Sequence, residues 1–395
     1  MYGRDPAGPA HPRAPRSPPR GLTRGDPRFT LDKTVWQTDL REESGMARPV
    51  IADVAARAGV SRTTVSHALS GKRPVSPRVL KRVQEAMAEL GYVPRRAAQT
   101  LKSGASQIVG LIVPDISNTF FADLAKGVED VSLDQGYNVV FGNTAFEVER
   151  ERFHLNMIRS QAVDGVVYAA GAPSPAPDTA EMLAGIPFVL VDEEVPGIGA
   201  TSVVSDNAEG GRLAARHLAA LNHRDALVLS ASSQLMSSLR RVEGFRDLWL
   251  ETGGSCEVRP GGFTYDGGYA AIREAAVLFL ERGFTCVFAV NDMMALGAVA
   301  ALRDLGLAIP ADVSVVGFDD VLAAHLIEPA LTTVRQDAAV LGRTAAEELY
   351  RIIADPASGP EHTVLPVTLR ERHSTAPAAA RRPAGRRRAP GRTRE

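Results

Sequence analysis

The alternation of apolar and polar residues divides the chain into two folded regions and two polar ends. Between residues 51 and 90, apolar positions recur at helical spacing in three short stretches. Beyond residue 107, short apolar runs alternate with amphipathic helical stretches. Residues 1–45 are dense in proline and glycine, residues 374–395 in alanine, proline and arginine, and neither end has a sustained apolar period. We expect a small helical domain followed by a larger α/β domain.

The first folded region predicts three helices joined by short turns. Gly59 can supply the left-handed backbone that a tight turn needs, and Ser61 and Ser76 are good N-caps. Gly91 follows the last apolar position and ends the third helix. The predicted helices span residues 51–57, 62–69 and 77–90. A helix, a glycine-containing turn and a second helix form a helix-turn-helix, a shape that other three-helix domains share.

In a helix-turn-helix, the N-terminal residues of the second helix reach base edges in the major groove. Arg62, Thr63 and His67 lie outside the apolar stripe of that helix, so we expect them to contact bases. Arg62 and His67 can donate to guanine, and Thr63 offers a hydroxyl and a methyl group. Nearby polar and basic side chains are candidates for phosphate contacts. These are Ser61, Lys72, Arg73, Arg78, Lys81 and Arg82.

The distribution of charge supports a nucleic-acid-binding role for this region. Residues 46–105 carry a net charge of +8 and residues 106–375 carry −17, although the whole chain is close to neutral at −1. A compact basic segment ahead of an acidic body suggests a head that binds a polyanion and a body that repels it. Double-stranded DNA is the polyanion that a helix-turn-helix favours.

The second folded region predicts an α/β architecture. Strands are expected at residues 108–113, 138–141, 165–168, 188–191, 226–229, 287–290 and 313–316. Helices are expected at residues 119–135, 207–221, 238–251, 266–281, 292–305 and 338–353. Alternating strands and helices form parallel sheets covered on both faces. A body of about 270 residues is large for one such sheet, so we expect two lobes.

Polar side chains follow several of these strands. Ligands of open parallel sheets bind outside the carboxyl ends of the strands, so these side chains are candidates for binding. Carboxylates and amides suit hydroxyl-rich ligands, Arg241 can supply a donor, and phenylalanines can stack on a sugar. The candidates are Asp115, Asp192, Asn291, Asp292, Asp319 and Asp320, with Phe120, Phe121 and Phe263. The same residue types also serve as helix caps, turn residues and core aromatics.

Residues 48–105 resemble the DNA-binding headpiece of the lactose/galactose repressor family. The matching stretches are ADVAARAGVSRTTVSHALSG and VSPRVLKRVQEAMAELGYVPRRAAQTLKSG. The body is similar to the effector-binding core of that family, which shares the periplasmic sugar-binding fold. Its matching segments are GLIVPDISNTFFADLAKGVED, GIPFVLVD, SSLRRVEGF, AVNDMMALGA, DVSVVGFDD and LTTVRQD. The resemblance covers residues 48–373, nearly all of the predicted folded chain.

The resemblance implies a hinge helix between headpiece and core, within residues 93–104. There Leu101 would wedge into the central base step of the minor groove, and Arg95 and Arg96 would contact the DNA backbone. Arg95 stands where the family usually has asparagine, and His67 stands where arginine is common. Both departures bear on which operator is read.

For the core, the resemblance implies an effector pocket and a dimer. Asp192, Arg241, Asn291 and Asp319 fall where sugar-binding members contact the effector, and Phe263 falls where an aromatic stacks on it. Asn118 and Phe120 lie in the first strand–helix loop, which also lines the pocket, as Asp115 would. The family's purine-binding branch uses the same shell of residues, so a purine remains an alternative to a sugar. The family's dimer surface includes the first core helix. Tetrameric members carry a C-terminal leucine heptad helix, which residues 376–395 lack, so we expect a dimer.

These observations predict five segments along the chain. They are a disordered extension at 1–45 with Met46 as the true start, a headpiece at 46–92, a hinge helix at 93–104, a core at 105–373 and a disordered basic tail at 374–395. The core would consist of two lobes with parallel sheets, like periplasmic binding proteins.

Several classes of protein are disfavoured by what the sequence lacks. No run of 18 apolar residues and no signal segment occurs, so we expect a cytoplasmic, nucleoid-associated protein. Two cysteines exclude a disulfide framework, and the scattered histidines predict neither a metal site nor a cofactor. No phosphate-binding loop, nucleophile elbow or zinc-protease motif is present, so we expect no enzyme activity.

We therefore expect a ligand-responsive transcriptional regulator. In this interpretation it represses genes of sugar uptake or catabolism, binds a palindromic operator as a homodimer, and is released by a small carbohydrate effector. A repressor that needs a purine or another metabolite as corepressor is one alternative, and an activator is another. A sugar-transport component would lack the basic head, and a sugar-modifying enzyme would need an acid–base pair in the cleft.

Overall fold

The computed structural model describes residues 49–70, 73–92, 105–160, 163–172, 176–231 and 235–378. The chain divides into two compact units, residues 1–94 and 95–395, each of which is described by itself. Several predictions fall outside the described residues. These are the N-terminal extension with Met46, Lys72, the hinge with Arg95, Arg96 and Leu101, and the tail beyond residue 378.

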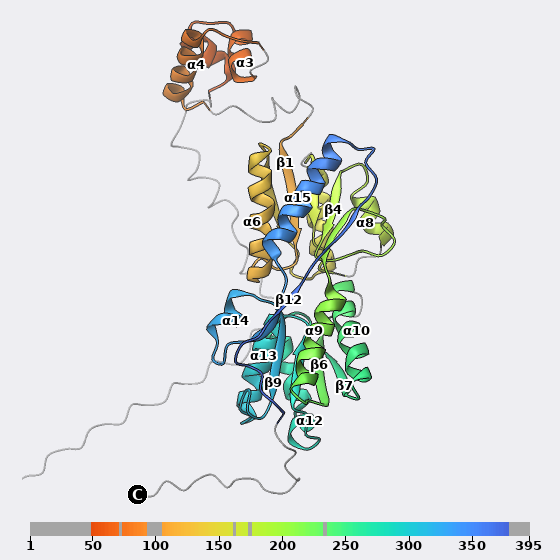
Figure 1. Cartoon of the computed structure of the whole chain (residues 1–395). Coiled ribbons are helices and arrows are strands. Elements are labelled where there is room, and N and C mark those ends of the chain that lie inside the picture. Colours follow the sequence, from red (N-terminus) through yellow and green to blue (C-terminus); the bar gives the residue numbers. More distant parts are fainter. Residues whose placement is uncertain are drawn as a thin grey trace, which may run out of the picture. The chain divides into compact units, whose positions relative to one another are not determined.

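Three short helices form the described part of the first unit (Figure 1). They are α2 (Ile51–Ala58), α3 (Arg62–Ser70) and α4 (Pro77–Leu90). Gly59 ends α2 with φ of 62° and Gly91 ends α4 with φ of 60°, the conformation that glycine adopts without strain. Apolar side chains of all three helices meet in one small core, which includes Val54, Val65 and Val83. The three predicted helices are confirmed.

Two six-stranded sheets form the second unit, one in each lobe (Figure 1). The first has the order β11 (His362–Leu365), β5 (Ser202–Ser205), β4 (Phe188–Val191), β3 (Gly165–Tyr168), β1 (Ile108–Val113) and β2 (Asn138–Asn143). The second has the order β12 (Thr368–Arg370), β10 (Thr332–Arg335), β9 (Ser314–Asp319), β8 (Cys286–Ala289), β6 (Asp225–Ser230) and β7 (Ser255–Pro260). Neighbouring strands are parallel except β10 and β12. The two-lobed α/β architecture with parallel sheets is confirmed.

Helices cover these sheets. The first lobe carries α6 (Thr119–Asp134), α7 (Val148–Ser160), α8 (Ala176–Met182) and α15 (Ala338–Ala354). The second carries α9 (Asn207–Ala220), α10 (Met236–Glu251), α11 (Tyr265–Glu274), α12 (Ala276–Leu280), α13 (Asp292–Asp304) and α14 (Leu322–Leu326). The described chain passes between the lobes after β5, after β10 and between β11 and β12.

Within the part of the chain that the structure describes, five strands and three helices were not predicted. Serine, threonine, histidine or arginine interrupts the apolar residues of the short strands β5, β10, β11 and β12, and β7 is largely exposed. None of the five therefore presents a continuous apolar run. Helices α7, α8 and α14 were also missed; α7 is strongly polar and the other two are short. The single helix predicted at 266–281 is wrong, because α11 and α12 are separate helices that meet at Ala275.

Glycines allow three pairs of helices to pack with their backbones in near contact. In the α9–α10 pair, a Cβ on Gly211 would lie 2.1 Å from the carbonyl oxygen of Arg241, and one on Gly244 would lie 2.1 Å from that of Ala208. The pairs α6–α15 and α11–α13 meet in the same reciprocal way. Their glycines are Gly127 with Gly342, and Gly268 with Gly297. The α9–α10 contact fixes the depth at which Arg241 enters the molecule.

Residues 374–378, which we assigned to the tail, are packed on the second lobe. Ser374 is fully buried, and its hydroxyl donates to the carbonyl of Val315 at 2.6 Å. The buried ring of His223 lies 3.0 Å from the carbonyl oxygen of Ala376 through Nε2. The folded core therefore extends beyond residue 373, because this segment satisfies polar groups that would otherwise be buried without partners.

The described residues contain neither a membrane-spanning helix nor a candidate metal site. None of the helices there is long and apolar enough to cross a membrane. No group of three or more histidine, cysteine, aspartate or glutamate side chains in this part of the chain could hold a metal ion.

We predict that Gly211→Ala destabilises the protein by about 1–3 kcal/mol, because the new methyl group meets backbone that cannot rotate away. Chemical denaturation measures the change. Gly359→Ala is the matched control, since a Cβ there meets nothing within 4 Å. Equal free energies of unfolding for the two variants would contradict the proposed close packing of α9 on α10.

Candidate functional site

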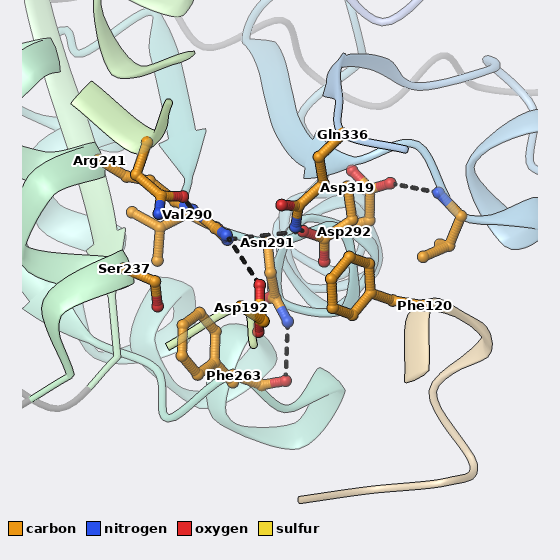
Figure 2. Close-up of polar contacts among 12 residues, drawn as sticks. Phe120, Asp192, Ser237, Arg241, Phe263, Val290, Asn291, Asp292, Asp319 and Gln336 are labelled. Atoms are coloured by element: carbon orange, nitrogen blue, oxygen red, sulfur yellow. Dashed lines mark hydrogen bonds and ion pairs between the residues drawn. The ribbon is translucent and has the colours of Figure 1, made fainter. Parts of the chain in front are cut away.

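A cleft between the two lobes gathers the carboxyl ends of strands from both sheets. Asp192 follows β4, Asn291 follows β8, and Asp319 ends β9 (Figure 2). The cleft encloses about 400 Å³ when its opening to solvent is included. It is lined by Pro114, Asn118, Phe120, Phe121, Phe146, Ala170, Asp192, Glu193, Leu235, Ser237, Arg241, Phe263, Asn291, Asp319 and Gln336.

Arg241 is the buried cation of this pocket, and only 2% of its surface is exposed. Its Nε donates to Asn207 Oδ1 and its Nη1 to the carbonyl of Val290, both at 2.7 Å. Nη1 also lies 3.5 Å from Asp319 Oδ1, and Nη2 lies 4.0 Å from Asp192 Oδ1 (Figure 2). These contacts hold the guanidinium in place, with a carboxylate of each lobe facing it.

The two carboxylates beside Arg241 carry raised pKa values. Burial raises the pKa of Asp192 to about 6, although the charge of Arg241 opposes this shift. Burial also raises the pKa of Asp319 well above its usual value. The positive charge of Arg241 opposes this shift, and the negative charge of the neighbouring Asp292 adds to it. Asp319 Oδ1 accepts a hydrogen bond from Gln336 Nε2 at 2.7 Å. Negative charge is therefore costly in this pocket before any ligand enters.

Strained backbone marks the same site. Asp192, Phe263 and Asp319 have φ values of 66°, 61° and 117°, in the left-handed region that non-glycine residues rarely adopt. Such conformations persist where the surrounding structure imposes them, and they cluster at binding sites. Asn291 supports one of them, because its Nδ2 donates to the carbonyl of Phe263 at 3.0 Å.

Aromatic rings supply the apolar surface of the pocket. Phe263 of the second lobe and Phe146 of the first have ring centroids 6.3 Å apart. Phe120 and Phe121, at the start of α6, meet edge to face at 5.0 Å. Rings from both lobes thus line a pocket whose polar groups are mostly carboxylates and amides.

Seven of the eight predicted effector-binding residues are brought together here. They are Asn118, Phe120, Asp192, Arg241, Phe263, Asn291 and Asp319. Asp115 is not among the lining residues; its Oδ1 accepts hydrogen bonds from the backbone N–H and hydroxyl of Ser117, as in a turn. Asn118 also caps α6, because its Oδ1 accepts from the N–H of Phe120 at 3.1 Å.

Four polar or aromatic lining residues were not predicted: Phe146, Glu193, Ser237 and Gln336. Phe146 and Gln336 lie in loops, and neither follows a predicted strand. Glu193 lies one residue beyond Asp192, and the strand-end rule selected only the first of the two. Ser237 precedes the start that we predicted for α10, which begins at Met236.

In the headpiece, α3 presents the predicted base-contacting residues. Arg62 and Thr63 are exposed, and His67 is half-buried. Ser61 Oγ accepts from the N–H of Thr64 at 3.0 Å, which fixes the start of this helix. Arg73 and Arg78 are exposed.

Arg82, a phosphate candidate, has an internal contact. Its guanidinium donates to the carbonyl of Ala58 and, at 3.3 Å, to that of Gly59. These carbonyls lie at the end of α2, where unpaired backbone acceptors need donors. Arg82 therefore stabilises the turn that leads into α3.

Comparison with known proteins places both parts of the chain. Residues 50–95 match the family "Bacterial regulatory proteins, lacI family", and residues 215–375 match "Periplasmic binding protein-like domain". The HTH-type transcriptional regulator DegA of Bacillus subtilis (strain 168) is 31% identical over 337 residues, which cover 84% of this chain and 99% of DegA. The chain belongs to the LacI family of bacterial regulatory proteins. It is a ligand-responsive, DNA-binding transcriptional regulator, as the resemblance implied.

Other LacI-family proteins are similar over most of their length. The HTH-type transcriptional repressor PurR of Vibrio atlanticus (strain LGP32) is 32% identical over 77% of this chain and 92% of PurR. A lac repressor dimer bound to operator and the anti-inducer ONPF superposes with a TM-score of 0.74, at 27% identity over 84% of this chain and 100% of that one. A CelR–cellobiose complex superposes with a TM-score of 0.61, at 33% identity over 83% of this chain and 100% of that one.

We predict that Asp192 makes this LacI-family protein less stable as pH rises. Its pKa of about 6 in the folded protein exceeds the ordinary value of 3.8, so the folded state binds the proton more tightly than the unfolded state does. The free energy of unfolding should therefore fall, relative to an Asp192→Asn variant, as pH rises from 3.8 to about 6. Urea denaturation across that range measures the difference. A constant difference between the two proteins would contradict the assignment.

Proposed function

We propose that this regulator is a repressor of genes for sugar uptake and catabolism. It binds a palindromic operator as a homodimer, and a small carbohydrate releases it. One observation carries the proposal: a pocket between two lobes, lined by carboxylates, amides and aromatic rings, lies on the same chain as a basic helix-turn-helix.

The composition of the pocket suits a carbohydrate. Asp192, Asn291 and Asp319 offer acceptors for vicinal hydroxyls, and Arg241 holds the two carboxylates in place. Phe263 offers a ring face to the apolar side of a sugar. The cellobiose of the CelR complex supports this choice, because CelR is 33% identical to this chain. A purine or another metabolite acting as corepressor is the alternative that the similarity to PurR favours, and activation in place of repression is a further alternative.

The DNA contacts divide into two groups. In the proposed complex Arg62, Thr63 and His67 read bases in the major groove. A second group contacts the DNA backbone, and the hinge helix within residues 93–104 inserts Leu101 into the minor groove. The backbone group comprises Ser61, Lys72, Arg73, Arg78, Arg95 and Arg96.

Effector binding must favour one of two conformations of the protein for release to occur. The pocket has walls from both lobes, so a ligand that contacts both changes how the lobes meet.

The proposed dimer surface includes α6, which begins at this pocket with Phe120 and Phe121. On α14, Leu322 and Leu326 are 62% and 74% exposed, and a partner chain would cover them. The regulator acts on DNA in the cytoplasm and catalyses no reaction.

Asp319→Ala should abolish the response to effector and leave DNA binding unchanged, because it removes an acceptor from the pocket but touches no headpiece residue. Fluorescence anisotropy of a labelled operator fragment, with and without effector, measures this. In the wild type, a coupling of about 1–3 kcal/mol corresponds to a drop in operator affinity of about 5–150-fold. Asp115→Ala is the matched control and should respond like the wild type. Retained response in Asp319→Ala would remove this residue from the pocket.

Leu101→Ala should weaken binding to the specific operator and leave effector binding unchanged. A side chain that wedges between base steps adds affinity only where the DNA can kink, so binding to non-specific DNA should change little. Anisotropy with specific and scrambled fragments at one salt concentration measures the ratio of the two affinities. An unchanged ratio would refute the wedge.

A further inference from the structure

The N-terminus of helix α10 borders the pocket, and a carboxylate of the chain itself occupies it. Glu193 Oε1 accepts from the backbone N–H of Ser237 at 3.0 Å, and its Oε2 accepts from the Ser237 hydroxyl at 2.6 Å. Glu193 belongs to the first lobe and Ser237 to the first turn of α10 in the second. Both are 3% exposed. The contact therefore joins the lobes within the pocket wall.

A helix N-terminus favours anions, because its first N–H groups lack partners within the helix and the helix dipole is positive there. A backbone N–H beside a serine hydroxyl is the kind of site at which a phosphate or carboxylate of a ligand binds. In this protein Glu193 takes that place. A phosphate or carboxylate on the effector would have to displace a buried side chain that already makes these hydrogen bonds.

The other cations near the pocket are also matched by carboxylates. Arg241 faces Asp192 and Asp319, at 4.0 and 3.5 Å. Arg240, the residue before Arg241 on α10, forms an ion pair with Glu194 at 2.7 Å. The N-terminus of α13 is capped by the pocket residue Asn291, whose Oδ1 accepts from the N–H of Met294 at 2.9 Å (Figure 2 shows Asn291 beside Phe263).

The buried polar atoms of the pocket that form no hydrogen bond are acceptors and not donors. Among the described residues that line the pocket, two buried side-chain atoms form no hydrogen bond, Asp192 Oδ1 and Gln336 Oε1, and both are acceptors. Gln336 is only 4% exposed, so water reaches it poorly. A buried acceptor that forms no hydrogen bond lowers stability, and a ligand hydroxyl that donates to it would recover that loss.

We propose that Glu193 is a specificity-determining residue that restricts the effector to uncharged, hydroxyl-bearing molecules and rejects phosphorylated or carboxylated ones. This proposal rests on the proposed function, which it refines by naming the class of carbohydrate. An anionic group in the pocket would meet Glu193, Asp192 and Asp319 with no unmatched cation beside them. An uncharged sugar would leave every ion pair intact and supply the donors that Asp192 and Gln336 lack.

The titration of these groups agrees with this assignment. Burial raises the pKa of Glu193 to about 7. Its hydrogen bonds with Ser237 lower the pKa, whereas the negative charge of Asp192 raises it further. Since the charged carboxylates already destabilise one another, an added anion would increase that cost.

The test uses the full-length protein and inorganic phosphate as the probe. Thermal unfolding is followed in phosphate and in chloride of equal ionic strength. The wild type and the control Glu243→Gln, which removes an exposed carboxylate of α10 outside the pocket lining, should show the same small difference between the salts. That difference reports any phosphate bound elsewhere, including the basic headpiece. Glu193→Ala vacates the N-terminus of α10, so phosphate should raise its melting temperature further and saturably, with at least about tenfold tighter apparent binding than in the wild type.

Two further variants locate the effect. Adding Ser237→Ala to Glu193→Ala should reduce the gain, because the hydroxyl donor is lost. If Glu193→Ala does not fold, Glu193→Gln removes the charge at nearly constant size and should still gain phosphate affinity over the wild type. Phosphate binding by the wild type equal to that of the variants, or folded Glu193 variants without any gain, would overturn the proposal. Neither readout involves DNA, so failure of the proposed function would appear separately, as a lack of effector-sensitive operator binding.

Discussion

The proposed effector pocket depends on one buried guanidinium, that of Arg241. Arg241 lies between the lobes with 2% of its surface exposed, and a charge at that depth is tolerated only when it is paired and hydrogen-bonded. Asn207, Val290 and Asp319 of the second lobe supply those contacts, and the carboxylate of Asp192 in the first lobe faces the guanidinium at 4.0 Å. The position of Arg241 depends in turn on the close approach of α10 to α9. The ligand-binding geometry is thus built into the helix packing of one lobe and completed by the other.

The arrangement of charge connects the pocket with the DNA-binding end of the chain. The acidic body of residues 106–375 repels polyanions, and the basic segment of residues 46–105 attracts them. Inside the pocket the same excess of carboxylates selects among small ligands. Since Asp192, Glu193 and Asp319 surround one cation, the pocket suits hydroxyl groups better than anions. A ligand that contacts both lobes can then shift the conformational equilibrium on which DNA affinity depends.

Sequence patterns predicted the fold and most of the pocket. Strands with long apolar runs and helices with strong periodicity were found, whereas the exposed strand β7 and the three-residue strand β12 gave no such signal. Asp192, Asn291 and Asp319 were predictable because carboxyl ends of parallel strands meet at one edge of a sheet. Phe146 and Gln336 were not, because loop residues reach the pocket only through tertiary packing. Asp115 was predicted wrongly as a pocket residue. Its carboxylate follows a strand, as those of the pocket do, but it accepts hydrogen bonds within its own turn, and the sequence does not distinguish the two cases.

Selection of DNA fragments is the most direct measurement of operator binding and of its dependence on a small molecule. Purified full-length protein is incubated with sheared DNA from its own genome, with and without the small-molecule fraction of the cell extract, and bound fragments are sequenced. An Arg62→Ala variant serves as the control for specific reading of bases. The wild type should enrich one inverted repeat upstream of a few transport or catabolic genes, and the variant should lose this enrichment. Recovery of unrelated fragments under both conditions, with no shared sequence, would contradict this expectation.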